Sequence, residues 1–70
     1  MMPLTLAQAG EVHIIRRIGG NPDVKKHLED LGFVAGSKVS IVSTIGGSLI
    51  VNMKESRVAI NQEIAGKIFV

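Results

Sequence analysis

The chain has 70 residues, 46% of them hydrophobic, and its only aromatic residues are Phe33 and Phe69. We expect residues 1–70 to form a single domain, because this length is too short for two. The sequence has no cysteine and a net charge of +2, which excludes disulfides, thiolate metal sites and thiol catalysis and gives no strong basic character.

The first third of the chain predicts a helical turn followed by a strand. Residues 5–10 suit one short helical turn, with Thr5 as its cap and Gly10 at its end. Residues 11–18 then alternate with a period of two and are rich in β-branched side chains, which is typical of a strand. We expect Val12, Ile14 and Ile18 to face the core, with His13, Ile15 and Arg17 on the opposite side.

A helix is predicted from Asn21 to Gly32. Asn21 is a favourable cap, and Pro22 fits the first helical position, where an N–H group has no partner. Gly32 ends the helix in the left-handed conformation, and Phe33 follows where such caps place a hydrophobic contact. Val24, Leu28 and Leu31 form one apolar seam along this helix.

The second half of the chain predicts strands. Residues 38–43 form one strand, with Val39 and Ile41 on one face, and Gly46–Gly47 is a hairpin turn. Leu49, Val51 and Met53 alternate along the next strand. A tight turn at Glu55–Ser56, a strand over 57–60, a short turn from Asn61 to Gly66 and a final strand over 67–70 complete the chain.

These elements predict a mainly β fold: a small SH3-like five-stranded barrel with one inserted α-helix. Closing the strands into a barrel removes the exposed edges that an open five-stranded sheet would have.

Three blocks of sequence resemble the ferrous iron transport protein A family (FeoA). The blocks are residues 3–10, residues 26–39 with the glycine stop at Gly32, and residues 56–70 with the Ile68-Phe69-Val70 ending. No single block is diagnostic, but together they cover almost the whole chain in the family's order. The same barrel also resembles the C-terminal domain of metal-dependent repressors of the diphtheria-toxin-repressor type.

The FeoA resemblance implies a small cytoplasmic accessory protein of bacterial ferrous iron uptake. Its partner would be ferrous iron transport protein B, a membrane protein with a cytoplasmic GTP-binding region, so it would meet the membrane only through that partner. The family's small protein does not carry iron itself. The alternative is an SH3-like interaction module, related to the repressor domain, that binds another protein.

The residue inventory argues against other functions. No serine, threonine or histidine is spaced for an assembled nucleophile and base, so we expect no enzyme and no catalytic residue. His13 and His27 lack the ligand cluster of a closed metal site, and we expect both to be half-packed boundary residues, with no metal or cofactor. Tyrosine and tryptophan are missing and the basic residues are dispersed, which argues against nucleic-acid binding.

Protein docking is therefore the expected activity, and its surface has several candidates. The preferred one is the charged helix face of Lys25, Lys26 and Glu29, and the hairpin tip at Gly46 and Gly47 is the second. Three further side chains fall on the expected outward parity of their strands, and they either cluster into an apolar patch or tuck under the helix. They are Ile15, Val42 and Ile50.

Overall fold

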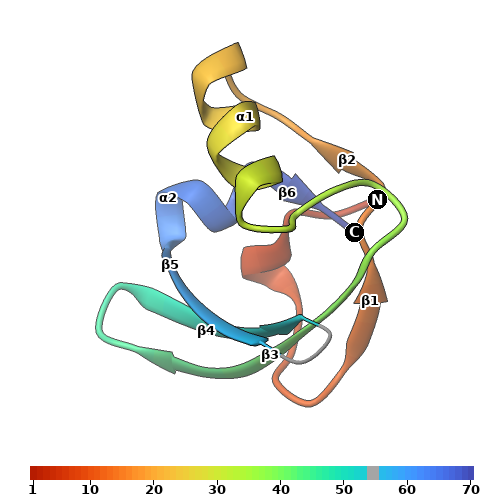
Figure 1. The fold of residues 1–70 in the computed structure, drawn as a ribbon. Coiled ribbons are helices and arrows are strands. Elements are labelled where there is room, and N and C mark those ends of the chain that lie inside the picture. Colours follow the sequence, from red (N-terminus) through yellow and green to blue (C-terminus); the bar gives the residue numbers. More distant parts are fainter. Residues whose placement is uncertain (54–55) are drawn as a thin grey trace.

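The computed structural model describes residues 1–53 and 56–70, in which strands form two sheets beside one main helix (Figure 1). The turn predicted at Glu55–Ser56 lies partly outside these residues. The mainly β fold with an inserted helix is confirmed. The elements in chain order are η1 (Leu4–Leu6), β1 (Val12–Ile14), β2 (Arg17–Ile18), α1 (Pro22–Asp30), β3 (Lys38–Ile45), β4 (Ser48–Met53), β5 (Ser56–Asn61), α2 (Gln62–Ala65) and β6 (Ile68–Phe69).

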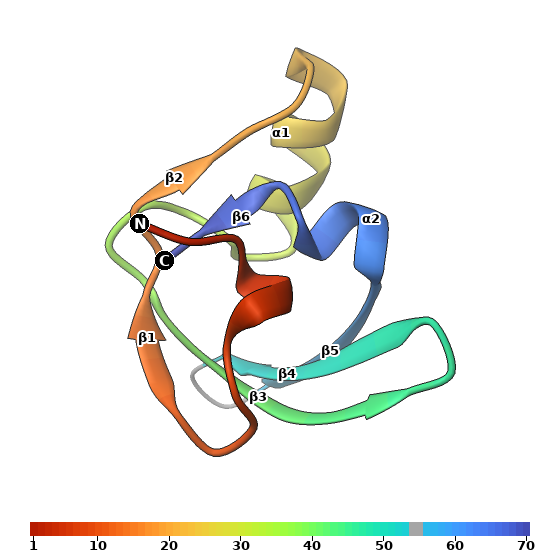
Figure 2. The same cartoon turned by 180° about the vertical axis from the view of Figure 1, so that it is seen from behind.

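The larger sheet is antiparallel and has the strand order β1-β3-β4-β5. Its two inner strands join at the Gly46–Gly47 turn, as predicted, and a shift in register falls between Ile41 and Ser43. The smaller sheet pairs β2 with β6. The two ends of the chain lie side by side (Figures 1 and 2), where Met2 and Val70 exchange two backbone hydrogen bonds of 2.9 and 2.8 Å.

The single strand predicted over residues 11–18 is wrong, because the chain bends after Ile14 and serves both sheets. The first part, β1, pairs with β3, and the second part, β2, pairs with β6. The predicted inward face is also wrong for β1: Ile15 is 1% exposed, whereas Val12 is 66% exposed. The alternation predicted a strand correctly, but apolar residues occupy both parities here and do not determine which one faces inward.

The inserted helix forms as predicted, because both ends are fixed by local interactions. The Asn21 side chain accepts a 2.9 Å hydrogen bond from the Val24 N–H, and Pro22 occupies the first turn. At the other end, Gly32 has φ +100°, and the Phe33 N–H donates to the Leu28 carbonyl at 2.8 Å. This is a Schellman cap, and it turns the chain so that Phe33 enters the core.

The predicted helical seam is correct in part. Leu28 is fully buried and Val24 packs against the core, but Leu31 is exposed. Leu31 is the C-cap residue, so it lies where the chain is already leaving the helix.

Two short helical turns flank the sheets. The N-terminal turn is shorter and earlier than predicted: it covers Leu4–Leu6, after an extended Pro3, and not residues 5–10. Thr5 does not cap it and Gly10 does not end it. The C-terminal turn is confirmed, since the Asn61 side chain accepts a 2.7 Å hydrogen bond from the Ile64 N–H. A cation–π contact links β2 to β6: the guanidinium carbon of Arg17 lies 4.9 Å from the centre of the Phe69 ring.

The core is apolar throughout the described residues, with no buried polar or charged residue among them. The alternation predicted for β3 and β4 is confirmed, because their inward side chains are all buried. The core residues are Leu4, Ile15, Leu28, Phe33, Val39, Ile41, Leu49, Val51, Met53, Ile60, Ala65, Ile68 and Val70.

Candidate docking surfaces

The charged face of α1 lies on the outside of the molecule. Lys25, Lys26 and Glu29 are all exposed, while Leu28 anchors the opposite side of the helix in the core. The three charged side chains project from a helix whose two ends are capped, by Asn21 and at Gly32. Two cations and one carboxylate on such an element can contact a partner of complementary charge.

The hairpin tip lies well away from that helix. Gly46 has φ +55°, a left-handed conformation that favours glycine, and both Gly46 and Gly47 are exposed. The Gly47 carbonyl accepts a 3.0 Å hydrogen bond from the Gln62 N–H, which ties the tip to the start of α2. Figures 1 and 2 show α1 and the β3–β4 hairpin at opposite ends of the molecule, so the two candidate surfaces are separate.

The possible apolar patch of Ile15, Val42 and Ile50 does not form. Ile15 belongs to the core, Ile50 is half-buried and Val42 is exposed. Exposed apolar side chains appear instead on β1, where Val12 and Ile14 point outward. The sequence contains the signal for this surface, because the opposite choice of inward parity in residues 11–18 would have placed Ile15 in the core and Val12 and Ile14 outside.

A groove of about 530 Å³ lies beside β1 on the outer face of the larger sheet. It is open because Gly36, Ser37 and Ser40 are small, whereas Val12 and Asn52 border it with larger side chains. Lys38 also lines the groove and is exposed, so its ammonium group is available to a ligand or partner.

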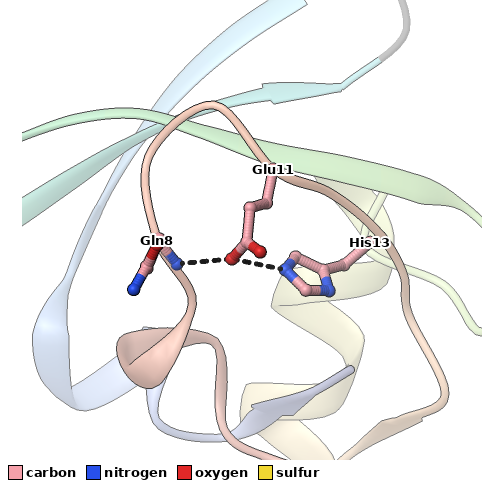
Figure 3. Close-up of polar contacts among 3 residues, drawn as sticks. All are labelled: Gln8, Glu11 and His13. Carbon is pink, nitrogen blue, oxygen red and sulfur yellow. Dashed lines mark hydrogen bonds and ion pairs between the residues drawn. The ribbon is translucent and has the colours of Figure 1, made fainter.

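His13 does not face outward as predicted. Its side chain is 22% exposed, and its Nε2 atom is buried without a hydrogen-bond partner in the described part of the chain. That atom lies 3.5 Å from Oε1 of Glu11, which in turn accepts a 3.1 Å hydrogen bond from the Gln8 N–H (Figure 3). The three residues brace the turn that leads into β1.

The half-packed environment predicted for both histidines is found at His13, whereas His27 is exposed on α1. Within residues 1–53 and 56–70, no group of three or more histidine and acidic side chains is placed to hold a metal ion. No helix there is long and apolar enough to cross a membrane.

Comparisons with known proteins agree on one family. A model of the FeoA domain family matches residues 2–70. The chain is 33% identical over 70 residues to "Putative Fe(2+) transport protein A" of Methanocaldococcus jannaschii, which covers 100% of this chain and 85% of that protein.

Solved structures agree on the fold. The FeoA protein of Chlorobium tepidum matches with a TM-score of 0.88 and 26% identity, over 97% of this chain and 67% of that one. The FeoA of Stenotrophomonas maltophilia complexed with zinc, described as a procaryotic SH3 domain protein, matches with a TM-score of 0.85 and 23% identity, over 99% and 88%. The predicted SH3-like fold is therefore confirmed.

The likeness to repressors is one of fold. A manganese-dependent transcriptional repressor matches with a TM-score of 0.86 and 17% identity, over 94% of this chain and 38% of the repressor. The matching part is thus one domain of a longer protein.

Proposed function

Because the chain belongs to the FeoA domain family, we propose that it supports ferrous iron uptake by docking onto the cytoplasmic GTP-binding region of ferrous iron transport protein B. The family consists of small accessory proteins that are not enzymes, which confirms the prediction of a non-catalytic chain. Three parts of this account are proposals: the docking itself, the identity of the partner and a cytoplasmic location.

The observation that carries this proposal is the family match along residues 2–70. The match spans nearly all of the given residues, so we place the proposed contact on this domain. In the described residues the interior is entirely apolar, which leaves the outer surface to act. A domain of this kind works through contacts with another molecule.

Such a module influences its partner through differences in affinity. A docked protein shifts an equilibrium between two conformations of the partner only if it binds one of them more tightly. A GTP-binding region has a nucleotide-bound form that differs from its nucleotide-free form, and these are the two conformations between which a docked protein can distinguish. We therefore expect this chain to bind one nucleotide state of the transporter more tightly than the others.

For the docking surface we propose the α1 face of Lys25, Lys26 and Glu29, with the Gly46–Gly47 tip as a secondary contact. Charged groups at the rim of an interface mainly accelerate association and make it salt-dependent. Reversing the two lysine charges in a Lys25→Glu, Lys26→Glu variant is expected to weaken binding severalfold, most clearly at low salt. The matched control is Lys25→Arg with Lys26→Arg, which keeps both charges in place.

The experiment is a pull-down of the purified transporter region by the immobilised chain. It is done with GTP analogue, with GDP and without nucleotide, and it is repeated with the full-length transporter in detergent. Retention that depends on nucleotide supports the proposal. If neither the isolated region nor the full-length transporter is retained in any nucleotide state, the proposed function is wrong.

If the charge-reversed variant is retained as well as the arginine control, the α1 face is not the docking surface. The proposed function then stands, and the contact lies elsewhere on the domain.

A further inference from the structure

The hydrogen bonds around β1 show which of its backbone groups are already used. The Ile15 N–H donates to the Ser37 carbonyl at 2.8 Å, and the Ile15 carbonyl accepts from the Gly36 N–H at 2.7 Å. The Arg16 N–H donates in the other direction, to the Phe69 carbonyl at 2.8 Å. Since successive residues of a strand direct their backbone groups to opposite sides, residues 13 and 15 face β3 and residues 12, 14 and 16 face away.

The N–H and C=O groups of Val12 and Ile14 therefore point to the free edge of the sheet. β1 is the edge strand in the order β1-β3-β4-β5. Outside the strand ladders, no backbone hydrogen bond of the described residues involves Val12 or Ile14. Each residue carries one donor and one acceptor, so this edge offers two of each to an incoming strand.

The side chains on this edge do not protect it. Natural edge strands are commonly blunted by lysine, proline or an inward-pointing charge. Here Val12 is 66% exposed and Ile14 is 41% exposed, and both are β-branched residues that favour strand pairing. Because β1 is only three residues long, it offers little surface for aggregation with other strands, but its backbone groups are still available to a partner strand.

Directly after β1, the same side of the chain already pairs with a strand, β6. β6 runs antiparallel to β2, and the Arg16–Phe69 bond lies on the side that Val12 and Ile14 also face. A strand added beside β1 would follow β6 along the same side of this segment, beyond the bend after Ile14. The fold therefore presents a partly filled strand position, and the empty part of it borders the groove on the outer face.

The charges near this edge indicate what kind of segment fits. Lys38 lies opposite Ile14 in the β1–β3 register, and Arg57 is at the far end of the row that starts at Val12. Arg16 is exposed directly after β1. One exposed carboxylate, Glu11, directly precedes β1, and its Oε1 already accepts from the Gln8 N–H. Lys38, Arg16 and Arg57 outnumber it among the described residues near the edge, so the net charge there is positive and complements an acidic segment.

We propose that β1 is a strand-addition site that takes an extended, acidic segment of the partner protein. The backbone of that segment pairs with Val12 and Ile14, and its apolar side chains pack against these two residues. Its carboxylates contact Lys38 and Arg16. Main-chain pairing supplies affinity in this mode of recognition, and the flanking side chains supply specificity. The inference rests on the proposed function, because it adds to the α1 face a second surface that contacts the same transporter region.

Amide hydrogen exchange in the complex tests this directly. In the free protein the Val12 and Ile14 amides have no backbone partner among the described residues and are expected to exchange quickly, whereas the His13 amide faces β3 and serves as an internal reference. Residue-resolved exchange is measured by NMR with and without the transporter's cytoplasmic region. Strand addition is expected to slow exchange at Val12 and Ile14 by about tenfold or more, since an added hydrogen bond must open first.

A variant gives the second measurement. Ile14→Pro removes the outward N–H but no bond of the β1–β3 ladder, and proline is tolerated on an edge strand. It is expected to weaken binding by about tenfold or more. Ile14→Val keeps the donor and the side-chain shape and is expected to bind like the wild type. Far-UV circular dichroism and unchanged exchange of the core amides establish that the proline variant is folded.

The outcomes separate the two proposals. Binding without protection at Val12 and Ile14, or with an unaffected and folded Ile14→Pro variant, overturns the strand-addition site and leaves the proposed function standing. No binding by the wild type overturns the proposed function together with this docking mode. Protection that appears without the transporter and grows with protein concentration means that a second copy of the chain takes the edge, which overturns the assigned partner.

Discussion

Replacing Gly32 with alanine isolates the energetic contribution of one backbone conformation. Gly32 has φ +100° at the end of α1, and its N–H donates to the Glu29 carbonyl at 2.9 Å. Among the described residues, a Cβ atom added there would meet only the methyl carbon of Met53, at 3.9 Å, which is an ordinary van der Waals distance. The substitution therefore creates no clash, and its cost comes from the backbone alone.

The expected magnitude follows from two opposing contributions. An L-residue held in the left-handed region costs about 1–2 kcal/mol. Alanine also restricts the unfolded chain, which returns about 0.4–1 kcal/mol. The net loss in free energy of unfolding is about 1 kcal/mol, and for a domain of this size that lowers Tm by about 4–8 °C. Asparagine tolerates this conformation better, so Gly32→Asn should lie between the wild type and alanine.

The assay is thermal and urea unfolding followed by far-UV circular dichroism, because the chain has no tryptophan or tyrosine to report by fluorescence. The matched control is Gly47→Ala, where φ is not positive and no atom of the described residues outside its chain neighbours lies within 4 Å of the added Cβ. This control should be neutral or slightly stabilising. If Gly32→Ala is as stable as the wild type, or if Gly47→Ala is equally destabilised, the explanation of the α1 cap is wrong.

Three further changes test the packing and the two N-caps. Leu28→Ala empties a fully buried site at a cost of about 2–5 kcal/mol, a large share of the roughly 4–10 kcal/mol that a 70-residue domain has, so its urea midpoint should fall steeply. Asn21→Ala removes the acceptor for the Val24 N–H and should cost about 1 kcal/mol in the same assay, whereas Asn21→Asp should cost much less because aspartate also caps. Asn61→Ala should be destabilising by a similar amount, and a neutral effect at either asparagine would contradict its capping role.

The parts of the fold that sequence predicted well are those fixed by local chemistry. Asn21 caps the helix within three residues of itself, and Gly32 ends it through its own φ angle. The β3–β4 hairpin is similar, because its turn and the alternation of Leu49 and Val51 are short-range features. Such signals do not depend on what the rest of the chain does.

The errors arose where tertiary contacts decide. Val12, Ile14 and Ile15 are all apolar, so the pattern fits a strand in either orientation, and the bend after Ile14 is set by pairing with strands distant in sequence. The inward face of β1 therefore depends on β3 and β6. Because the inward face of β1 was predicted the wrong way round, the exposed edge of Val12 and Ile14 was not among the predicted docking surfaces. The charged face of α1, in contrast, could be predicted from the helical pattern alone.

Isothermal titration calorimetry of the chain with the transporter's cytoplasmic GTP-binding region tests the central claim most directly. The titration is made with the region loaded with GTP analogue, loaded with GDP and free of nucleotide. Docking predicts saturable binding with a Kd in the micromolar range or tighter, and an affinity that differs between nucleotide states. The absence of saturable binding in all three states, together with no retention by the full-length transporter, would contradict the account.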